Sequence, residues 1–355
     1  MDETSLGDVG ERELIRTVLR DRYGGSESFG DDCASLAGPL IDGRSLVVTT
    51  DPCPTPVASL LGFSDLYYWG WLLATINLSD IAAAGALPIG LVTSLTLPNS
   101  TTLTGFGRLL DGIDECCELA GTSVIGGNLK EGSEMVLSAT ALGTCAGRPL
   151  SRRGASPGDA VLVLGDLGSF WAGYFLARRE ADVAGLESAD WLANVLRPRA
   201  KTELGQRLQR ARLVTACLDN SDGLFPSLSA LGEASGVGFL LDIPDSCFSM
   251  KVLAIASALG VDPRRLALGW GDWQLIVTTR TAGIGAVTAA AADCGVPCAH
   301  VGTVRAELGT DMVVDGGAGR LMRLDSERFS KDSWFLSGLD LYIERMLTDS
   351  LVDVN

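Results

Sequence analysis

Hydrophobic and polar positions recur with helical and strand periods along the chain, and their order predicts a mixed α/β fold. In residues 11–22 the apolar side chains stand at helical spacing, and glycines then end the pattern before a loop that carries Asp31 and Asp32. The β-branched run at 46–50 stops at Asp51-Pro52, which predicts a buried strand with Asp51 at its carboxyl end. Functional residues concentrate at such strand ends.

Residues 66–86 are mainly small and apolar, and their polar exceptions are Asn77, Ser79 and Asp80. This composition predicts a buried helix with one functional face, because a buried aspartate needs a partner. The same reasoning predicts a strand at 91–97, an amphipathic helix at 103–119, a strand-to-loop junction at 124–128 and a strand at 135–144.

The segment 149–159, PLSRRGASPGD, is rich in Pro, Gly, Ser and Arg, and an apolar strand pattern follows at 160–164. A chain of 355 residues exceeds the size at which a single hydrophobic core stops growing. We therefore predict an N-terminal domain at 1–150 and a C-terminal domain at 151–355. The second half continues with mixed strands and helices, including an Ala-rich helix at 283–293 and helical periodicity at 332–355.

Composition narrows the class of protein. Hydrophobic residues make up 46% and charged residues 20%, and no apolar stretch reaches the length that spans a membrane. The N-terminus lacks the apolar stretch and cleavage site of a secretory signal, so we expect a soluble cytoplasmic protein. A formal charge of −16 disfavours binding to nucleic acid and to anionic membranes, and an anionic substrate then needs a cation at the site.

The cysteine spacing and the single histidine argue against a zinc site and against histidine-dependent nucleophilic catalysis. The nine cysteines show no C-x-x-C pair and no zinc-type spacing, which indicates reduced and mostly buried thiols. The single histidine, His300, follows an apolar run, and we interpret it as structural. Catalysis by a Ser-His-Asp or Cys-His arrangement is therefore not expected.

An acidic residue beside Gly, Ser or Thr recurs at predicted element ends: Asp31-Asp32, Asp51, Asp80 and Asp222. Magnesium prefers oxygen ligands and typically bridges one or two carboxylates to substrate phosphates. Taken singly, each aspartate fits a helix cap or a turn better than a metal site, since Asp beside Gly or Ser is common there. If the carboxylates converge, their mutual repulsion implies a cation, so the residues alone leave both interpretations open.

Six ordered motifs resemble those of thiamine-monophosphate kinases: GDDCASL (30–36), VVTTD (47–51), INLSDIAAAGALP (76–88), VIGGN (124–128), SRRGASPGD (151–159) and DNSDGL (219–224). Two weaker matches, Arg197-Pro198 and GWGDWQLI (269–276), extend the similarity over roughly residues 10–280. The resemblance implies a two-domain aminoimidazole ribonucleotide synthetase-like fold of α/β (α+β) class. It also implies a homodimer that pairs N-terminal sheets, and ATP in the cleft between the domains.

By the same resemblance, ATP and Mg²⁺ are the expected cofactors and a small molecule is the phosphate acceptor. The implied magnesium ligands are Asp31, Asp32, Thr50, Asp51, Asp80, Asp219 and Asp222, with Asp80 and Asp222 as the catalytic pair. The implied nucleotide contacts are Gly127, Asn128, Arg152 and Ser221.

The chain departs from the family pattern at one metal-binding position, which weakens the binding of one magnesium ion, and at several positions on the acceptor side. Asn128 stands where the family has aspartate, Leu72 where it has lysine, and Gly271 where it has glutamate. The histidine-phenylalanine pair that usually follows the strand aspartate is missing. These changes argue against thiamine monophosphate and favour a less anionic acceptor.

Two tryptophans, Trp270 and Trp273, flank Asp272 in the altered segment. Indoles can stack on a flat or cationic acceptor, so we treat all three residues as candidate acceptor contacts, although tryptophan in an apolar stretch more often packs in the core.

Three functions are compatible with these residues. The first is a phosphotransferase that acts on thiamine monophosphate or another small molecule. The second is an ATP-dependent synthetase or dehydratase that activates an amide or carboxyl oxygen by phosphorylation. The third is a degenerate nucleotide-binding paralogue without catalysis, which Asn128 and the altered acceptor residues favour.

Overall fold

The computed structural model describes residues 13, 17–18, 20–23, 31–35, 43–178, 180–181, 183, 186, 188–314, 320–325, 338–348 and 351–354. Most of the helix predicted at 11–22, and much of the periodic segment at 332–355, lie outside these residues. Within them are α3 (Arg20–Tyr23), α16 (Leu339–Leu347) and β13 (Leu351–Asp353).

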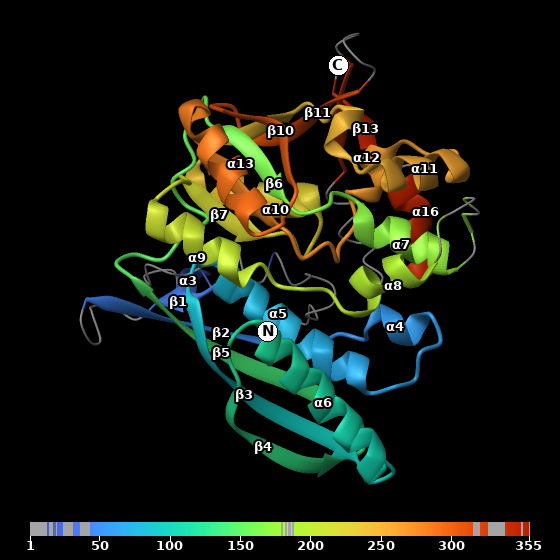
Figure 1. The fold of residues 1–355 in the computed structure, drawn as a ribbon. Helices are drawn as coiled ribbons and strands as arrows, with labels where there is room; N and C mark the ends of the chain where they lie inside the picture. The colour runs from blue at the N-terminus through green and yellow to red at the C-terminus, as the bar shows by residue number, and fades with distance from the viewer. Residues whose placement is uncertain are drawn as a thin grey trace, which may run out of the picture.

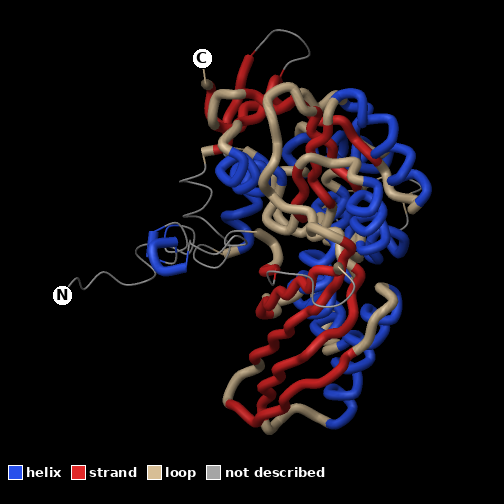
Figure 2. The backbone as a smooth tube through the Cα atoms, turned by 90° about the vertical axis from the view of Figure 1, so that its left-hand side faces the viewer, coloured by secondary structure: helices blue, strands red, loops and turns tan. Residues whose placement is uncertain are grey.

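A five-stranded sheet organises the N-terminal part, with the strand order β1-β2-β5-β3-β4. Its strands are β1 (Ala34–Ser35), β2 (Arg44–Pro52), β3 (Leu87–Pro98), β4 (Val124–Gly132) and β5 (Val136–Ala146). The long helices α5 (Tyr67–Ala83) and α6 (Leu103–Leu119) cover one face of this sheet, and the short helix α4 (Val57–Leu60) precedes them (Figure 1). Figure 2 shows the strands of this sheet free of described helices on the other side.

From residue 43 onward, the predicted elements of this half are present, with one difference. The strand expected at 46–50, the helix at 66–86 and the helix at 103–119 correspond to β2, α5 and α6. The segment 124–128, predicted to leave a strand for a loop, instead continues as β4 to Gly132. Pairing with β3 causes the difference, because the ladder from Leu91 to Pro98 supplies hydrogen-bond partners that outweigh the low strand propensity of Gly126-Gly127.

An eight-stranded sheet organises the C-terminal part in the order β13-β12-β11-β8-β10-β6-β9-β7. Its other strands are β6 (Ala160–Leu164), β7 (Ala216–Asp219), β8 (Gly238–Leu241), β9 (Leu275–Thr279), β10 (Cys298–Arg305), β11 (Gly309–Val314) and β12 (Arg320–Leu324). The helices are α7 (Ser169–Ala177), α8 (Ser188–Leu196), α9 (Thr202–Ala211), α10 (Leu224–Ser235), α11 (Met250–Leu259), α12 (Pro263–Leu266) and α13 (Ile284–Asp293). Apolar residues from both faces of this sheet are buried, with α9 and α13 on one face and α7, α10 and α11 on the other.

Direct contacts hold the two sheets in a fixed relation. The Trp71 indole N–H and the Thr75 hydroxyl, both on α5, donate to the Pro198 carbonyl at 2.7 and 3.0 Å. The Gln209 amide on α9 donates to the carbonyls of Ala146 and Arg148 at 2.6 and 3.0 Å. Helix α5 is therefore fixed against the segment that leads into α9, and its last turn faces the second sheet.

Three further features bear on the sequence predictions. All nine cysteines are free thiols, and five of them are buried. His300 is exposed on β10, where its Nε2 lies 3.0 Å from the Gly302 carbonyl oxygen. Among the described residues, no helix is long and apolar enough to cross a membrane.

Candidate active site

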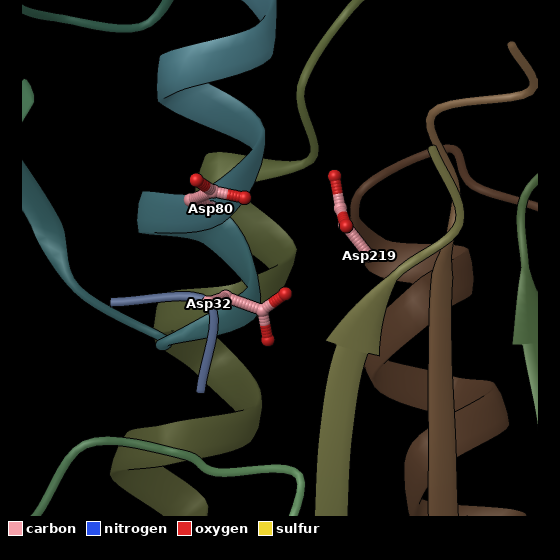
Figure 3. Close-up of side chains that lie close together, drawn as sticks. All are labelled: Asp32, Asp80 and Asp219. Carbon is pink, nitrogen blue, oxygen red and sulfur yellow. The ribbon is translucent and has the colours of Figure 1, made fainter. Parts of the chain in front are cut away.

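Three aspartates that lie far apart in the sequence meet between the two sheets. Asp32, Asp80 and Asp219 each offer a carboxylate oxygen, and these atoms lie within 4.8 Å of one another. Figure 3 shows the three side chains directed toward a common point. Asp32 precedes β1, Asp80 lies in the last turn of α5, and Asp219 ends β7. The convergence therefore requires both halves of the chain.

Neighbouring hydroxyls and one guanidinium hold the three carboxylates in place. Asp80 accepts a hydrogen bond from the Thr49 hydroxyl at 2.6 Å. Asp219 accepts one from Ser79 at 2.7 Å and one from Ser221 at 3.2 Å. Ser79 lies on α5 and Asp219 ends β7 in the other half of the chain, so their hydrogen bond joins the two domains within the cluster.

Asp32 pairs with the only arginine that directly contacts the cluster among the described residues. The Arg152 guanidinium donates to Asp32 at 2.7 Å, and the Asp32 side chain is 4% exposed. Burial alone lowers the pKa of Arg152, but the charges of Asp32, Asp219 and Asp80 outweigh it and raise that pKa. Arg152 is therefore a permanent cation beside the three carboxylates.

The buried carboxylates of the cluster repel one another unless a further cation is bound. Burial, followed by the charges of Asp219 and Asp32, raises the pKa of Asp80 well above its ordinary value. Burial and the charge of Asp32 raise the pKa of Asp219 to about 7. The pKa of Asp32 is also raised, chiefly by burial, although Arg152 opposes the shift. One arginine does not balance three carboxylates, and an all-oxygen donor set of this kind suits Mg²⁺.

A cavity of roughly 150 Å³ opens on the cluster. Its lining residues are Asp51, Pro52, Pro54, Ile76, Asp80, Asp219, Ser221 and Trp273. The lining includes three carboxylates and a hydroxyl together with proline, isoleucine and tryptophan residues. The cavity thus combines a site for cations with an apolar surface suited to an organic ligand.

The structure separates the remaining predicted metal ligands into two groups. Asp51 lines the cavity, and its charge contributes to the raised pKa of Asp80. Asp222 is exposed just beyond Ser221, and its charge contributes to the raised pKa of Asp219. Asp31 is used differently: its carboxylate accepts hydrogen bonds from the Ser151 hydroxyl at 3.0 Å and the Arg152 N–H at 2.8 Å. Asp31 therefore joins the N-terminal segment to the start of the second domain.

The Thr50 side chain faces away from the cluster, whereas the side chain of its neighbour Thr49 contacts it. The Thr50 hydroxyl donates to the Ala139 carbonyl at 2.9 Å, whereas Thr49 contacts Asp80. Side chains alternate between the two faces of a strand, so Thr49 and Asp51 share one face and Thr50 the other. Sequence reasoning missed Thr49, although this alternation was available to identify it.

Gly127 and Asn128 do not reach the aspartate cluster of their own chain. Both lie on β4, the edge strand, where Gly127 is opposite Thr93 of β3. Thr93 is opposite Ala139, which in turn is opposite Asp51. Three strand spacings, or about 14 Å, therefore separate Gly127 from Asp51. A side chain at Gly127 would also overlap Thr93, because a Cβ there would lie 2.4 Å from its hydroxyl oxygen.

The three candidate acceptor contacts occupy different environments. Trp270 packs in an aromatic cluster, with its ring centroid 5.4 Å from that of Phe170 and 5.3 Å from that of Trp171. The Asp272 carboxylate accepts hydrogen bonds from the N–H groups of Gly168 and Phe170, both at 2.9 Å, at the start of α7. Of the three residues, only Trp273 lines the cavity.

Comparisons with known proteins match both halves of the chain. The family model described as AIR synthase related protein, N-terminal domain, matches residues 30–145, and the corresponding C-terminal domain matches residues 156–315. The thiamine-monophosphate kinase of Methanopyrus kandleri is 34% identical over 271 residues, which are 75% of this chain and 83% of that protein. The Escherichia coli (strain K12) enzyme of the same name is 31% identical over 301 residues, which are 81% of this chain and 87% of that one.

A solved structure shares the fold. AaThiL complexed with AMPPCP and TMP matches with a TM-score of 0.74 at 25% identity, and the match covers 88% of this chain and 96% of that chain.

Proposed function

The chain belongs to the AIR synthase related family, together with the thiamine-monophosphate kinases, and on this premise we propose that it is an ATP-dependent kinase that phosphorylates a small-molecule acceptor. The observation that carries the proposal is the convergence of three aspartates from both domains on one cavity. AaThiL, which has the same fold, was solved with AMPPCP and TMP. We propose that the cavity beside the cluster receives the corresponding reactants.

Magnesium fits the cluster by its donor set, because all the converging ligands are carboxylate oxygens whose pKa values burial raises. We propose that Asp32, Asp80 and Asp219 hold it, with Asp51 and Asp222 as further ligands nearby. Bound magnesium neutralises the charge of the triphosphate and of the developing transition state. Asp31 and Thr50 are less suited to this role, since Asp31 bonds to Ser151 and the Thr50 side chain faces the other side of the sheet.

The chain's own residues would orient the phosphates. Arg152 is a fixed cation next to the cluster, and a guanidinium matches the geometry of phosphate oxygens. The Ser221 hydroxyl lies on the cavity wall and can donate to a phosphate oxygen if it releases Asp219. Asp80 and Asp222 are the proposed catalytic pair, and they act through the charge they place at the transferring group. Positioning and electrostatics supply most of the acceleration in phosphoryl transfer, so no general base is required.

We also propose that the active protein is a homodimer. The sheet face without described helices carries exposed apolar side chains, at Leu87, Ile89, Val92 and Val136, that suit a second copy (Figure 2). Gly127 and Asn128 lie on the edge strand of the same sheet. About 14 Å separates them from Asp51 of their own chain, and we propose that they contact the nucleotide in the site of the partner. The cytoplasmic location and the lack of nucleic-acid and membrane partners stay predictions from composition.

The function is tested by incubating the purified protein with ATP, Mg²⁺ and thiamine monophosphate and measuring ADP, AMP, inorganic phosphate and thiamine diphosphate together. Thiamine diphosphate formed with an equal amount of ADP would support the kinase and identify thiamine monophosphate as an acceptor. Asp80→Asn should abolish turnover, whereas Asp114→Asn, which changes an exposed carboxylate on α6, should not. ATP binding without product would redirect the search to other acceptors. No magnesium-dependent ATP binding would refute the kinase and favour a non-catalytic role.

A further inference from the structure

A second cavity, of roughly 250 Å³, lies where the N-terminal sheet meets helix α9 of the C-terminal domain. Among the described residues, it shares no lining residue with the cavity beside the aspartates. Arg44, which lines it, begins β2, and Asp51 lies seven residues further along the same strand, about 23 Å away. The cavity is therefore separate from the proposed catalytic site. Its lining residues are Arg44, Gly85, Leu87, Thr144, Cys145, Ala146, Gln206, Gln209 and Arg210.

The lining of this cavity is positively charged, although the whole chain has a formal charge of −16. It contains two arginines, one from each domain, and its described residues include no aspartate or glutamate. Neither Arg44 nor Arg210 forms an ion pair with another described residue. By contrast, Arg207 on the same helix as Arg210 pairs with Glu203 and Asp293 at 2.9 and 3.4 Å. Two cations with no carboxylate beside them favour an anionic ligand.

Neutral acceptors orient both guanidinium groups. The Arg44 Nε donates to the Thr144 hydroxyl at 3.1 Å, and an Arg210 amino group donates to the Gln206 side-chain oxygen at 3.0 Å. A guanidinium carries five N–H donors, so four remain on each side chain after these bonds. A terminal phosphate offers three acceptor oxygens and a charge of about −1.5 to −2. It therefore matches two arginines better than a carboxylate, which carries one charge and two oxygens.

Contacts across the domain boundary hold the walls of the cavity. The buried Gln209 amide donates to the carbonyls of Ala146 and Arg148 at 2.6 and 3.0 Å. Gly85 has a φ of +67°, and a Cβ there would lie 2.5 Å from the Gln209 Cβ, so a glycine is needed for α9 to pack against the loop after α5. Leu87 and Ala146 add apolar side chains to the lining. A volume below about 300 Å³ limits any organic part of the ligand to a small one.

We propose that this cavity is a second binding site, which takes a phosphate group, either free or as the monoester of a small molecule. Arg44 binds the phosphate from the N-terminal domain and Arg210 binds it from the C-terminal domain, so the bound anion connects the two domains. The inference does not depend on the kinase function, because no residue of the aspartate cluster takes part. Leu87 also belongs to the sheet face proposed for a second copy, so the experiment uses the full chain in its native oligomeric state.

Calorimetric titration with inorganic phosphate and with phenyl phosphate tests the proposal. EDTA is present and the ionic strength is held constant, so that neither anion binds the aspartate cluster through magnesium. The wild type should bind at least one probe, and Arg44→Gln and Arg210→Gln should each weaken that binding about tenfold, since each removes a charged donor. Arg207→Gln, which changes an ion-paired arginine on the same helix, should leave the binding unchanged. All three side chains are exposed, so the variants should unfold at the temperature of the wild type.

The two probes also distinguish the two sources of the phosphate group. Tighter binding of phenyl phosphate identifies a monoester as the ligand, and equal or tighter binding of inorganic phosphate identifies the free anion. If the wild type binds neither probe, the proposal is overturned. Unchanged binding in Arg44→Gln or in Arg210→Gln, or an equal loss in Arg207→Gln, overturns it as well, because the anion then binds elsewhere on the protein.

Discussion

Replacing Asp219 by asparagine tests whether the aspartate cluster is strained in the absence of magnesium. The substitution removes one charge and keeps the shape that meets Ser79 and Ser221. At 4.8 Å, the largest separation within the cluster, two full charges repel by about 3.5 kcal/mol at an effective dielectric near 20. The rise in the pKa of Asp219 from 3.8 to about 7 corresponds to about 4 kcal/mol. Both figures predict that the variant is more stable than the wild type.

The direction of the pH dependence follows from the raised pKa. The folded protein holds the Asp219 proton more tightly than the unfolded chain, so the wild type loses stability as the pH rises from 3.8 through about 7. Asparagine does not titrate, and Asp219→Asn escapes this loss. The advantage of the variant should be about 2 kcal/mol at pH 5 and about 4 kcal/mol at pH 8.

The assay is thermal unfolding of both proteins at pH 5 and pH 8, with and without Mg²⁺. A difference of 1 kcal/mol moves the midpoint by about 2–4 °C for a domain of 150–250 residues. Without metal, the unfolding midpoint of the variant should be higher than that of the wild type at pH 8. Magnesium at a hundred times its Kd should raise the free energy of unfolding of the wild type alone, by about 2.7 kcal/mol. Equal stabilisation of both proteins by magnesium, or a variant that is no more stable at pH 8, would refute the reasoning.

Three further predictions concern other parts of the molecule. Asp80→Ala and Asp222→Ala should each remove magnesium-dependent ATP binding from a folded protein, as measured by calorimetry with circular dichroism as the folding control. Gly271→Glu should not lower the KM for thiamine monophosphate and should lower the free energy of unfolding by about 1–3 kcal/mol, because the side chain meets the Phe170 ring; a stable variant with a lower KM would contradict this. His300→Ala should leave turnover unchanged, since the imidazole is exposed on β10 and contacts the Gly302 carbonyl.

Local pattern determined much of the fold, because periodicity reports which face of an element is buried. The β-branched run that ends at Asp51 is β2, and the small apolar stretch around Asp80 is α5. The ordered motifs identified the family, and the family gave the two-domain architecture. The alternation within β2 also indicates that Thr49 and Asp51 share a face and that Thr50 lies on the other.

Tertiary structure alone decided which candidate residues meet. No local pattern shows that Asp32, Asp80 and Asp219 converge while Asp31 bonds to Ser151, because these contacts span between 48 and 187 residues of sequence. Strand register placed Gly127 at the edge of the sheet, about 14 Å from Asp51. The two tryptophans around Asp272 look equivalent in the sequence, but Trp270 packs against Phe170 and Trp171, whereas Trp273 lines the cavity.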